Sequence, residues 1–186
     1  MGGIGNIAWG AINEIHKAGY LLKAYTSRCG HIDIPREFVH EFHLQKMLSR
    51  VWNPFKAFDW LLCRKIKNCD IAHLWTVPSL LSVKRAKRNG IASVNERAST
   101  HPQYQFEIVK EEFGAFGQTL RWKEVDVKIA SEQLGLSDAI IVPSQQVKDS
   151  FSKHGDWGDR IHVIPFGVDT DQFKPDPAAK DPNTFH

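Results

Sequence analysis

Two kinds of hydrophobic pattern alternate along the chain. Short apolar runs with the length of buried strands occupy residues 20–27, 70–75, 91–96, 138–144 and 160–165. Between them, apolar residues recur at the spacing of amphipathic helices, over residues 4–18, 78–90, 103–117, 122–136 and 145–155. This alternation predicts an α/β fold, a Rossmann-like three-layer domain with a parallel sheet.

Glycine, proline and serine mark the ends of these segments. Gly19, Gly90 and Gly155 follow predicted helices, where a left-handed residue commonly ends the helix. Pro78 lies near the start of one helix, and Ser144 is placed to cap another. We therefore expect helix boundaries close to these positions.

The beginning of the pattern is unusual. Glycines that open a helix in such folds normally follow a buried strand, yet Met1 directly precedes Gly2, Gly3 and Gly5. We expect the natural protein to begin upstream, with a first strand that is missing from this chain.

Composition narrows the class of protein. The chain has 186 residues, of which 42% are hydrophobic and 24% charged, as in one ordinary globular domain. Its net charge of +3 is too small to indicate a nucleic-acid partner. Cys29, Cys63 and Cys69 have neither bridge nor metal-site spacing, which suits a reducing compartment. With no signal peptide and no apolar run of about 20 residues, we expect a cytoplasmic protein.

The opening segment "GGIGNIA" is a candidate anion site. Glycines allow a ligand close to the backbone, and the first N–H groups of a helix favour negative charge. The segment also satisfies the relaxed dinucleotide pattern G-x-G-x-x-A. A dinucleotide site needs an acidic residue after the next strand, but "AYTSRCG" has none. Ligand binding is favoured over a purely structural turn, and a nicotinamide-dependent oxidoreductase domain stays an alternative.

Polar residues gather where the predicted strand 91–96 ends, in "VNERASTH". Ligands of open α/β sheets bind at such strand ends. Arg97 can hold a phosphate or carboxylate with two hydrogen bonds, and Glu96 or His101 can carry a proton. The structural alternative is a surface Glu–Arg pair with a helix cap at Ser99 or Thr100.

A second strand end, in "DIAHLW", carries His73 and Trp75. An aromatic ring beside a cleft can stack on a sugar or a lipid, although such a Trp is more often packed in the core. Both residues are candidates for a site at the same edge of the sheet.

Residues 41–69 interleave basic and aromatic side chains. Basic amphipathic helices with Trp and Phe can lie in an anionic membrane interface. The slightly favoured interpretation is a pair of helices that cover the sheet, with Lys and Arg extending into solvent. A non-catalytic membrane-associating module is therefore a further alternative for the whole chain.

Taken together, these segments resemble the N-terminal, acceptor-side domain of a family 4 retaining glycosyltransferase of the GT-B fold. The segments that carry the resemblance are "GGIGNIAWGAINEIHKAGY", "DIAHLW", "SDAIIVPSQQVKDSF" and, most specifically, "VIPFGVDTDQFKP". The resemblance runs from Gly2 to Pro175. It implies an N-terminal domain over residues 1–173 and, in 174–186, the start of a linker to an absent C-terminal donor-binding domain. Gly167 and Asp169 would mark the crossing between the two domains.

The resemblance also implies an activity. A sugar would move from a nucleotide-diphosphate sugar to an acceptor hydroxyl of a polysaccharide, glycolipid or small molecule, with retention and without a metal or other cofactor. This chain alone would be inactive. Under the membrane alternative for residues 41–69, which rests on their basic and aromatic pattern, the contact would be peripheral and on the inner membrane face.

Residue roles follow from the same resemblance. Gly2, Gly3 and Gly5 would lie near the donor phosphates, and the acceptor side would include the residues His73, Trp75 and Ser99. Many members place a His near the reacting sugar, where this chain has Glu96 and Arg97, with His101 four residues later. Whether Arg97 or His101 takes the role of that His stays open.

Overall fold

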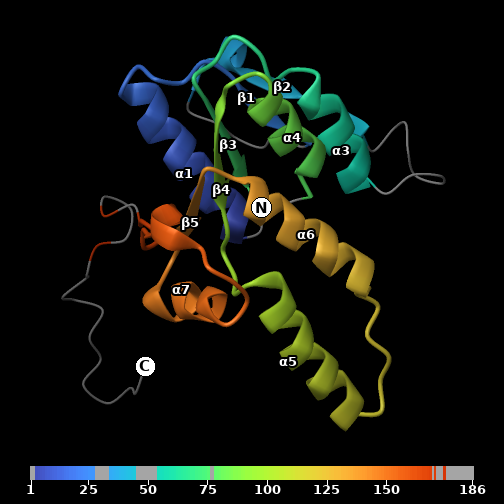
Figure 1. Ribbon diagram of the computed structural model, residues 1–186. Coiled ribbons are helices and arrows are strands. Elements are labelled where there is room, and N and C mark those ends of the chain that lie inside the picture. The colour runs from blue at the N-terminus through green and yellow to red at the C-terminus, as the bar shows by residue number, and fades with distance from the viewer. Residues whose placement is uncertain are drawn as a thin grey trace.

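The computed structural model describes residues 3–27, 34–44, 54–75, 78–168, 170 and 174 (Figure 1). Within these ranges, β1 (Ala24–Thr26) and β2 (Val39–Glu41) pair as a two-stranded parallel sheet. A second parallel sheet contains four strands in chain order, namely β3 (Ile71–Trp75), β4 (Ala92–Glu96), β5 (Ala139–Val142) and β6 (Ile161–Val163). The predicted parallel α/β fold class is confirmed.

The helices alternate with the strands as predicted. They are α1 (Gly3–Lys17), α3 (Pro54–Cys63), α4 (Leu80–Arg88), α5 (Pro102–Ala115), α6 (Glu124–Leu136) and α7 (Gln145–Ser152), with 3-10 turns at Arg36–Phe38 and Gly158–Arg160. Gly19, Gly90 and Gly155 have positive φ angles of 80°, 68° and 136°, and all three follow helices. The Oγ of Ser144 accepts a hydrogen bond from the N–H of Val147 at 3.3 Å, so the predicted cap of α7 is confirmed.

Two features differ from the expectation. The strand at 20–27 shortens to Ala24–Thr26, and its partner β2 was not predicted. Both strands have three residues, too few to show a clear alternation of apolar and polar positions. The strands also form two sheets rather than one. The first strand expected upstream of the glycines stays a prediction.

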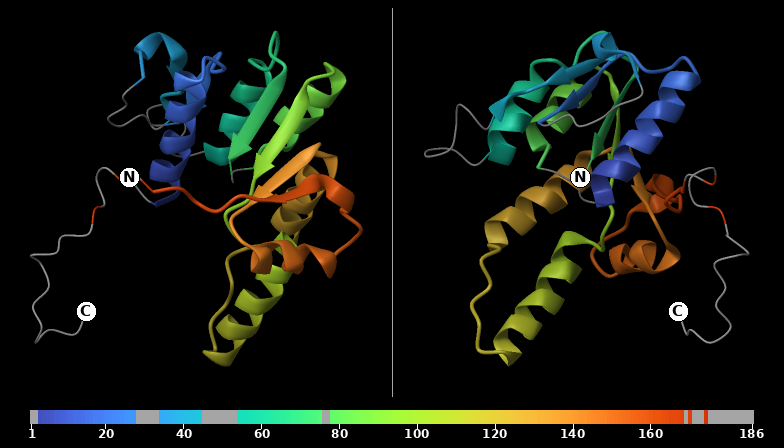
Figure 2. Two further views of the ribbon diagram at one scale, coloured as in Figure 1. Left: turned by 90° about the vertical axis from the view of Figure 1, so that its left-hand side faces the viewer. Right: turned by 180° about the vertical axis from the view of Figure 1, so that it is seen from behind.

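Helices cover both faces of the strands. Figures 1 and 2 show α1 on one side of β3 and β4, with α3, α4 and α6 on the other. α5 and α7 lie beyond the carboxyl ends of the strands, where the chain leaves β4 and β5 (Figure 1). This arrangement confirms the three-layer architecture.

The main core lies between the four-stranded sheet and two of its covering helices. Ala72 and Leu74 of β3 pack in one cluster with buried side chains of α3 and α4, including Leu62 and Val83. A second cluster joins α7 to β5 and β6, with Phe151 fully buried. Because neighbouring strand residues point to opposite faces, the core positions of β3 direct His73 and Trp75 to the other face.

The basic and aromatic stretch contributes one described helix to this core. α3 buries Ala57 and Leu62, while its Phe55 and Trp60 are 52% and 41% exposed. The Lys and Arg side chains of residues 54–69 are exposed, which agrees with the covering role. Residues 45–53, with Lys46 among them, lie outside the described residues. In the described part of the chain, no helix has the length and apolar character needed to cross a membrane.

The chain leaves the sheet along its carboxyl edge. Figure 2 shows the segment after β6 passing the ends of the central strands toward the start of α1. This segment exposes Ile164, Phe166 and Val168, which are 52%, 40% and 64% accessible. Gly167, expected at the domain crossing, lies in it, whereas Asp169 lies outside the described residues.

Candidate functional site

The candidate site lies at the carboxyl edge of the four-stranded sheet. Parallel strands end at the same edge, and β3 pairs with β4 so that His73 opposes Val94 and Trp75 opposes Glu96. Opposed residues of a parallel pair point to the same face, so His73, Trp75 and Glu96 share the face on which α1 lies. The sheet register therefore brings together residues that are more than 20 positions apart in the chain.

His73 and Glu96 form a direct contact on this face. The Nε2 atom of His73 lies 2.9 Å from Oε2 of Glu96, and the Glu96 side chain is largely buried. The His73 ring stacks on Trp75, with ring centroids 5.6 Å apart and planes inclined by 29°. An imidazole–carboxylate pair beside an aromatic face can orient a hydroxyl group and support a sugar ring.

Arg97 follows Glu96 directly and is held in place by the loop before α5. Its Nε donates to the carbonyl of Thr100 at 3.0 Å, and its Nη2 donates to Oε1 of Gln105 at 2.8 Å. The hydroxyl of Ser99 donates to the same Gln105 oxygen at 3.2 Å. These bonds fix the guanidinium at the end of β4.

The charge of Arg97 has no protein counter-ion within the described ranges, where no carboxylate forms an ion pair with it. Burial lowers the pKa of Arg97 to about 10, so the side chain is still a cation at neutral pH. A half-buried cation that has hydrogen-bond partners but no counter-ion is stabilised when an anion binds beside it. Arg97 is therefore suited to a phosphate or carboxylate.

His101 lies in a different environment, between α5 and α7. Its Nδ1 accepts a hydrogen bond from the N–H of Gln103 at 3.2 Å, so His101 caps α5. The structural alternative of a cap at Ser99 or Thr100 is therefore wrong, because the helix begins at Pro102 and the ring of His101 accepts from the free N–H of Gln103. Within the described part of the chain, His101 makes no contact with Glu96 or His73.

The surroundings of His101 keep it neutral. The side chain is 3% exposed and stacks on His154, with centroids 4.6 Å apart and planes inclined by 11°. Burial lowers the pKa of His101 to about 4, and the nearby His154 and Arg97 add to this effect while Glu107 opposes it. At neutral pH, His101 is thus a neutral ring with one N–H donor.

The glycines lie where the sequence placed them relative to the strands. Gly3 is the first residue of α1 and Gly5 is in its first turn, whereas Gly2 lies outside the described residues. The start of α1 lies at the level of the carboxyl ends of β3 and β4 (Figure 2). The first turn of α1 contains no acidic residue, so the helix itself supplies no negative charge to its positive end.

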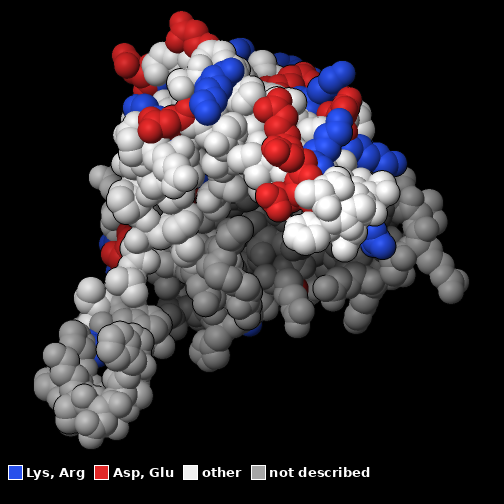
Figure 3. All heavy atoms as spheres, turned by 90° about the horizontal axis from the view of Figure 1, so that it is seen from below, with Lys and Arg blue, Asp and Glu red and all other residues white. Residues whose placement is uncertain are grey.

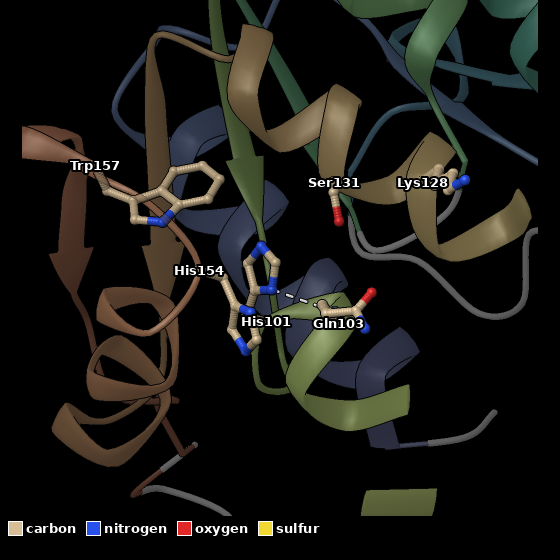
Figure 4. A pocket seen from close by; sticks show the side chains of 6 residues that line it. All are labelled: His101, Gln103, Lys128, Ser131, His154 and Trp157. Carbon is tan, nitrogen blue, oxygen red and sulfur yellow. Dashed lines mark hydrogen bonds between the residues drawn. The ribbon is translucent and has the colours of Figure 1, made fainter. Parts of the chain in front are cut away.

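A hollow of about 440 Å³ opens beside His101. Figure 4 shows its lining side chains, from the start of α5, from α6 and from the turn after α7, which are His101, Gln103, Lys128, Ser131, His154 and Trp157. Five of these, Gln103, Lys128, Ser131, His154 and Trp157, were not among the predicted site residues. No local motif marks them, since only the packing of α6 and α7 against α5 brings them together.

Charge on the surface around this edge is mixed. Seen from the carboxyl side, Lys, Arg, Asp and Glu side chains lie mainly along one border, and much of the remaining described surface is uncharged (Figure 3). Among the described residues, no group of three or more His, Cys, Asp or Glu side chains could hold a metal ion. On the face seen in Figure 3, the charged side chains are thus of mixed sign.

Comparison with known proteins places the chain in a family. The family model described as Glycosyltransferase Family 4 matches residues 1–172, which is more than nine-tenths of the chain. No curated protein matches the chain. The matched region contains both the strand-end residues and the glycines at the start of α1.

Proposed function

Because the chain belongs to glycosyltransferase family 4, as the N-terminal domain of a GT-B enzyme, we propose that it transfers a sugar from a nucleotide-diphosphate donor to an acceptor hydroxyl with retention at the anomeric carbon. The bond from the anomeric carbon to the diphosphate oxygen breaks, and a bond to the acceptor oxygen forms. The acceptor proton passes to the departing diphosphate. No metal or other cofactor takes part in this scheme.

The observation that carries the proposal is the guanidinium of Arg97 at the carboxyl edge, which is fixed by hydrogen bonds and forms no ion pair within the described residues. Negative charge grows on the diphosphate as the sugar leaves, and preorganised cations and N–H groups stabilise it. Arg97 supplies a cation at the end of β4. The start of α1, with Gly3 and Gly5, supplies helix N–H groups at the level of the same carboxyl edge (Figure 2).

Arg97 is the better candidate for the role of the usual family His. His101 is neutral, largely buried and turned toward α7, while Arg97 directly follows the strand and remains charged. We assign His101 a positioning role, since its ring caps α5 and thereby supports the loop that holds Arg97.

The acceptor would lie on the face that carries His73, Trp75 and Glu96. The stacked Trp75 ring gives a surface for a sugar or other ring, and the His73–Glu96 pair orients the attacking hydroxyl. Ser99 lies beside Arg97 through their shared bond to Gln105 and is a further polar contact. The acceptor is a polysaccharide, a glycolipid or a small molecule.

The proposal includes a second, donor-binding lobe that closes over the carboxyl edge. Residues 1–173 form the first lobe, residues 174–186 begin the linker, and Gly167 and Asp169 mark the crossing. Closure would exclude water and align donor and acceptor. The second lobe would cover the exposed apolar residues after β6, which are Ile164, Phe166 and Val168. The single lobe is then inactive.

The experiment compares the 186-residue chain with the same chain joined to a family 4 C-terminal lobe. Each is incubated with a panel of nucleotide-diphosphate sugars and hydroxyl acceptors, and the anomeric configuration of the product is read by NMR. We expect retained product from the two-lobe protein only, with Arg97→Gln strongly impaired and the exposed Arg121→Gln unchanged. No transfer from any donor, or an inverted product, would overturn the proposal. Turnover by the single lobe would overturn its second part.

The family match favours sugar transfer over the nicotinamide and purely membrane-associating alternatives. Peripheral membrane contact is compatible with a transferase, and we propose it for α3 and its flanking residues. The exposed Phe55 and Trp60 lie on the same helix as exposed basic side chains, including Lys56 and Arg64 close to it. Such a surface can bind an anionic bilayer from the cytoplasmic side.

A further inference from the structure

The hollow beside His101 contains two buried polar atoms without partners. The Nε2 atoms of His101 and His154 are both buried and make no hydrogen bond in the described structure. Figure 4 shows the two rings face to face, with Trp157 on one side and Ser131 and Lys128 on the other. Buried polar groups are nearly always hydrogen-bonded, so two such atoms in one hollow indicate an absent partner.

The hydrogen bonds already present decide what His101 offers to that partner. Its Nδ1 is the acceptor for the N–H of Gln103, so the proton of the neutral ring is on Nε2. His101 is 3% exposed and therefore presents a buried N–H donor to the hollow. The missing partner is an acceptor, such as an oxygen atom.

The local charge favours a negative acceptor. Lys128 lines the hollow, and within the described ranges it forms no ion pair. The hollow lies at the start of the 14-residue helix α5, whose N-terminal end adds positive potential. The nearby carboxylate of Glu107 accepts a hydrogen bond from the Gln103 side chain at 2.8 Å. Arg97 is bound to the loop before α5, through the carbonyl of Thr100.

We propose that this hollow is a subsite for an oxyanion group, a phosphate or a carboxylate, carried by the acceptor. One oxygen of the anion accepts from Nε2 of His101, another lies against the Lys128 ammonium, and the Ser131 hydroxyl donates to the group. His154 lies beside the anion oxygen that accepts from His101. The identification of the ligand as the acceptor rests on the proposed function, whereas binding of the anion itself does not.

This subsite is separate in the fold from the face that carries His73 and Glu96. Its residues come from the start of α5, from α6 and from the turn after α7, rather than from the strands. An acceptor that spans both would place its acidic group between the helices and its hydroxyl over the sheet edge. The subsite would therefore select acidic acceptors over neutral ones.

The test is an NMR titration of the full chain labelled with ¹⁵N-histidine at pH 7 and constant ionic strength. Inorganic phosphate and glucuronate are the probes, and chloride is the reference anion. We expect saturable shifts of the His101 and His154 ring nitrogens. Lys128→Met should weaken binding about tenfold through loss of a charge-assisted contact, while Lys123→Met, which removes an exposed charge outside the hollow, should not.

The outcomes separate the sources of the anion. Shifts with phosphate alone support a phosphorylated acceptor, shifts with glucuronate alone support an acidic sugar, and shifts with both support the shared oxyanion site. No shift with either probe, or equal affinity in the Lys128→Met protein, overturns the proposal. Since the titration does not depend on sugar transfer, a chain that binds the anion but supports no transfer contradicts only the proposed function.

Discussion

Asp59 caps a helix to which it does not belong, because its Oδ1 accepts hydrogen bonds from both the N–H and the hydroxyl of Ser82, at 3.0 and 2.6 Å. Its other oxygen accepts from the N–H of Leu81 at 2.8 Å. Asp59 is on α3 and 4% exposed, while Ser82 and Leu81 form the first turn of α4. Burial raises the pKa of Asp59 despite these bonds, which act to lower it. The contact joins the two helices that cover β3.

Replacement of Asp59 should therefore destabilise the domain. Asp59→Ala leaves two N–H groups and a hydroxyl without their acceptor, and we expect the free energy of unfolding to fall by about 2–3 kcal/mol. Urea denaturation measures this change. Asp159→Ala removes an exposed carboxylate and should change the free energy by less than about 0.5 kcal/mol. A double-mutant cycle with Ser82→Ala that shows no coupling would contradict the cross-helix cap.

The buried His101 should make stability depend on pH. Its pKa of about 4 in the folded state is below its ordinary value of 6.5, so the unfolded chain binds more protons between these values. Stability should therefore be complete above pH 6.5 and decrease as the pH falls toward 4, by at most about 3 kcal/mol from this group. Urea denaturation at several pH values measures this slope.

Two variants identify the source of that slope. His101→Asn keeps a side-chain acceptor at the cap of α5 but does not titrate in this range, so it should flatten the dependence. His162→Asn, at an exposed position, should leave it unchanged. A slope that persists in His101→Asn would assign the effect to another group.

The fork geometry of Arg97 should matter for activity beyond its charge. Lysine keeps the positive charge but cannot donate in fixed directions to the Thr100 carbonyl and to Gln105 at once. In the two-lobe enzyme, Arg97→Lys should lower kcat/KM by roughly 100-fold, as for other lost transition-state donors. Steady-state assays against the control Arg121→Lys measure this effect. Unchanged kcat with a folded protein would exclude Arg97 from charge stabilisation.

The exposed side of α3 should bind anionic membranes weakly. At low salt we expect the chain to co-sediment with vesicles that contain phosphatidylserine, and at high salt this binding should disappear because the attraction is screened. Phe55→Ser with Lys56→Gln should reduce the bound fraction several-fold, whereas Phe116→Ser, at an exposed position on the turn after α5, should not. Binding that is insensitive to salt and to both changes would place the contact elsewhere or make it non-specific.

The sequence predicted the strand-end residues because their positions depend on local pattern. β3 and β4 are short runs with turn residues on both sides, so the sequence alone places His73, Trp75 and Glu96 at one edge. Arg97 follows for the same reason. These predictions needed only the period of a strand and the rule that parallel strands end together.

The residues that could not be predicted depend on contacts between distant elements. His101 follows the same strand, but its surroundings come from α7 and the turn after it, about 50 residues later. Ser150 accepts a hydrogen bond from the backbone N–H of His101, and His154 stacks on its ring. Similarly, Asp59 has no capping signature in its own helix, because the N–H groups it satisfies belong to α4. Such interactions leave no periodic signal in the chain.

The packing of β3 has a consequence for amino-acid substitutions outside the site. Ala72 and Leu74 make no contact with any proposed ligand, yet their burial against α3 and α4 decides which way His73 and Trp75 point. A shift of β3 by a single residue would exchange its two faces. His73 and Trp75 would then point into the core between the sheet and α3 and α4. Loss of function can therefore arise from small changes to methyl groups on the opposite side of the sheet, with every reactive group intact.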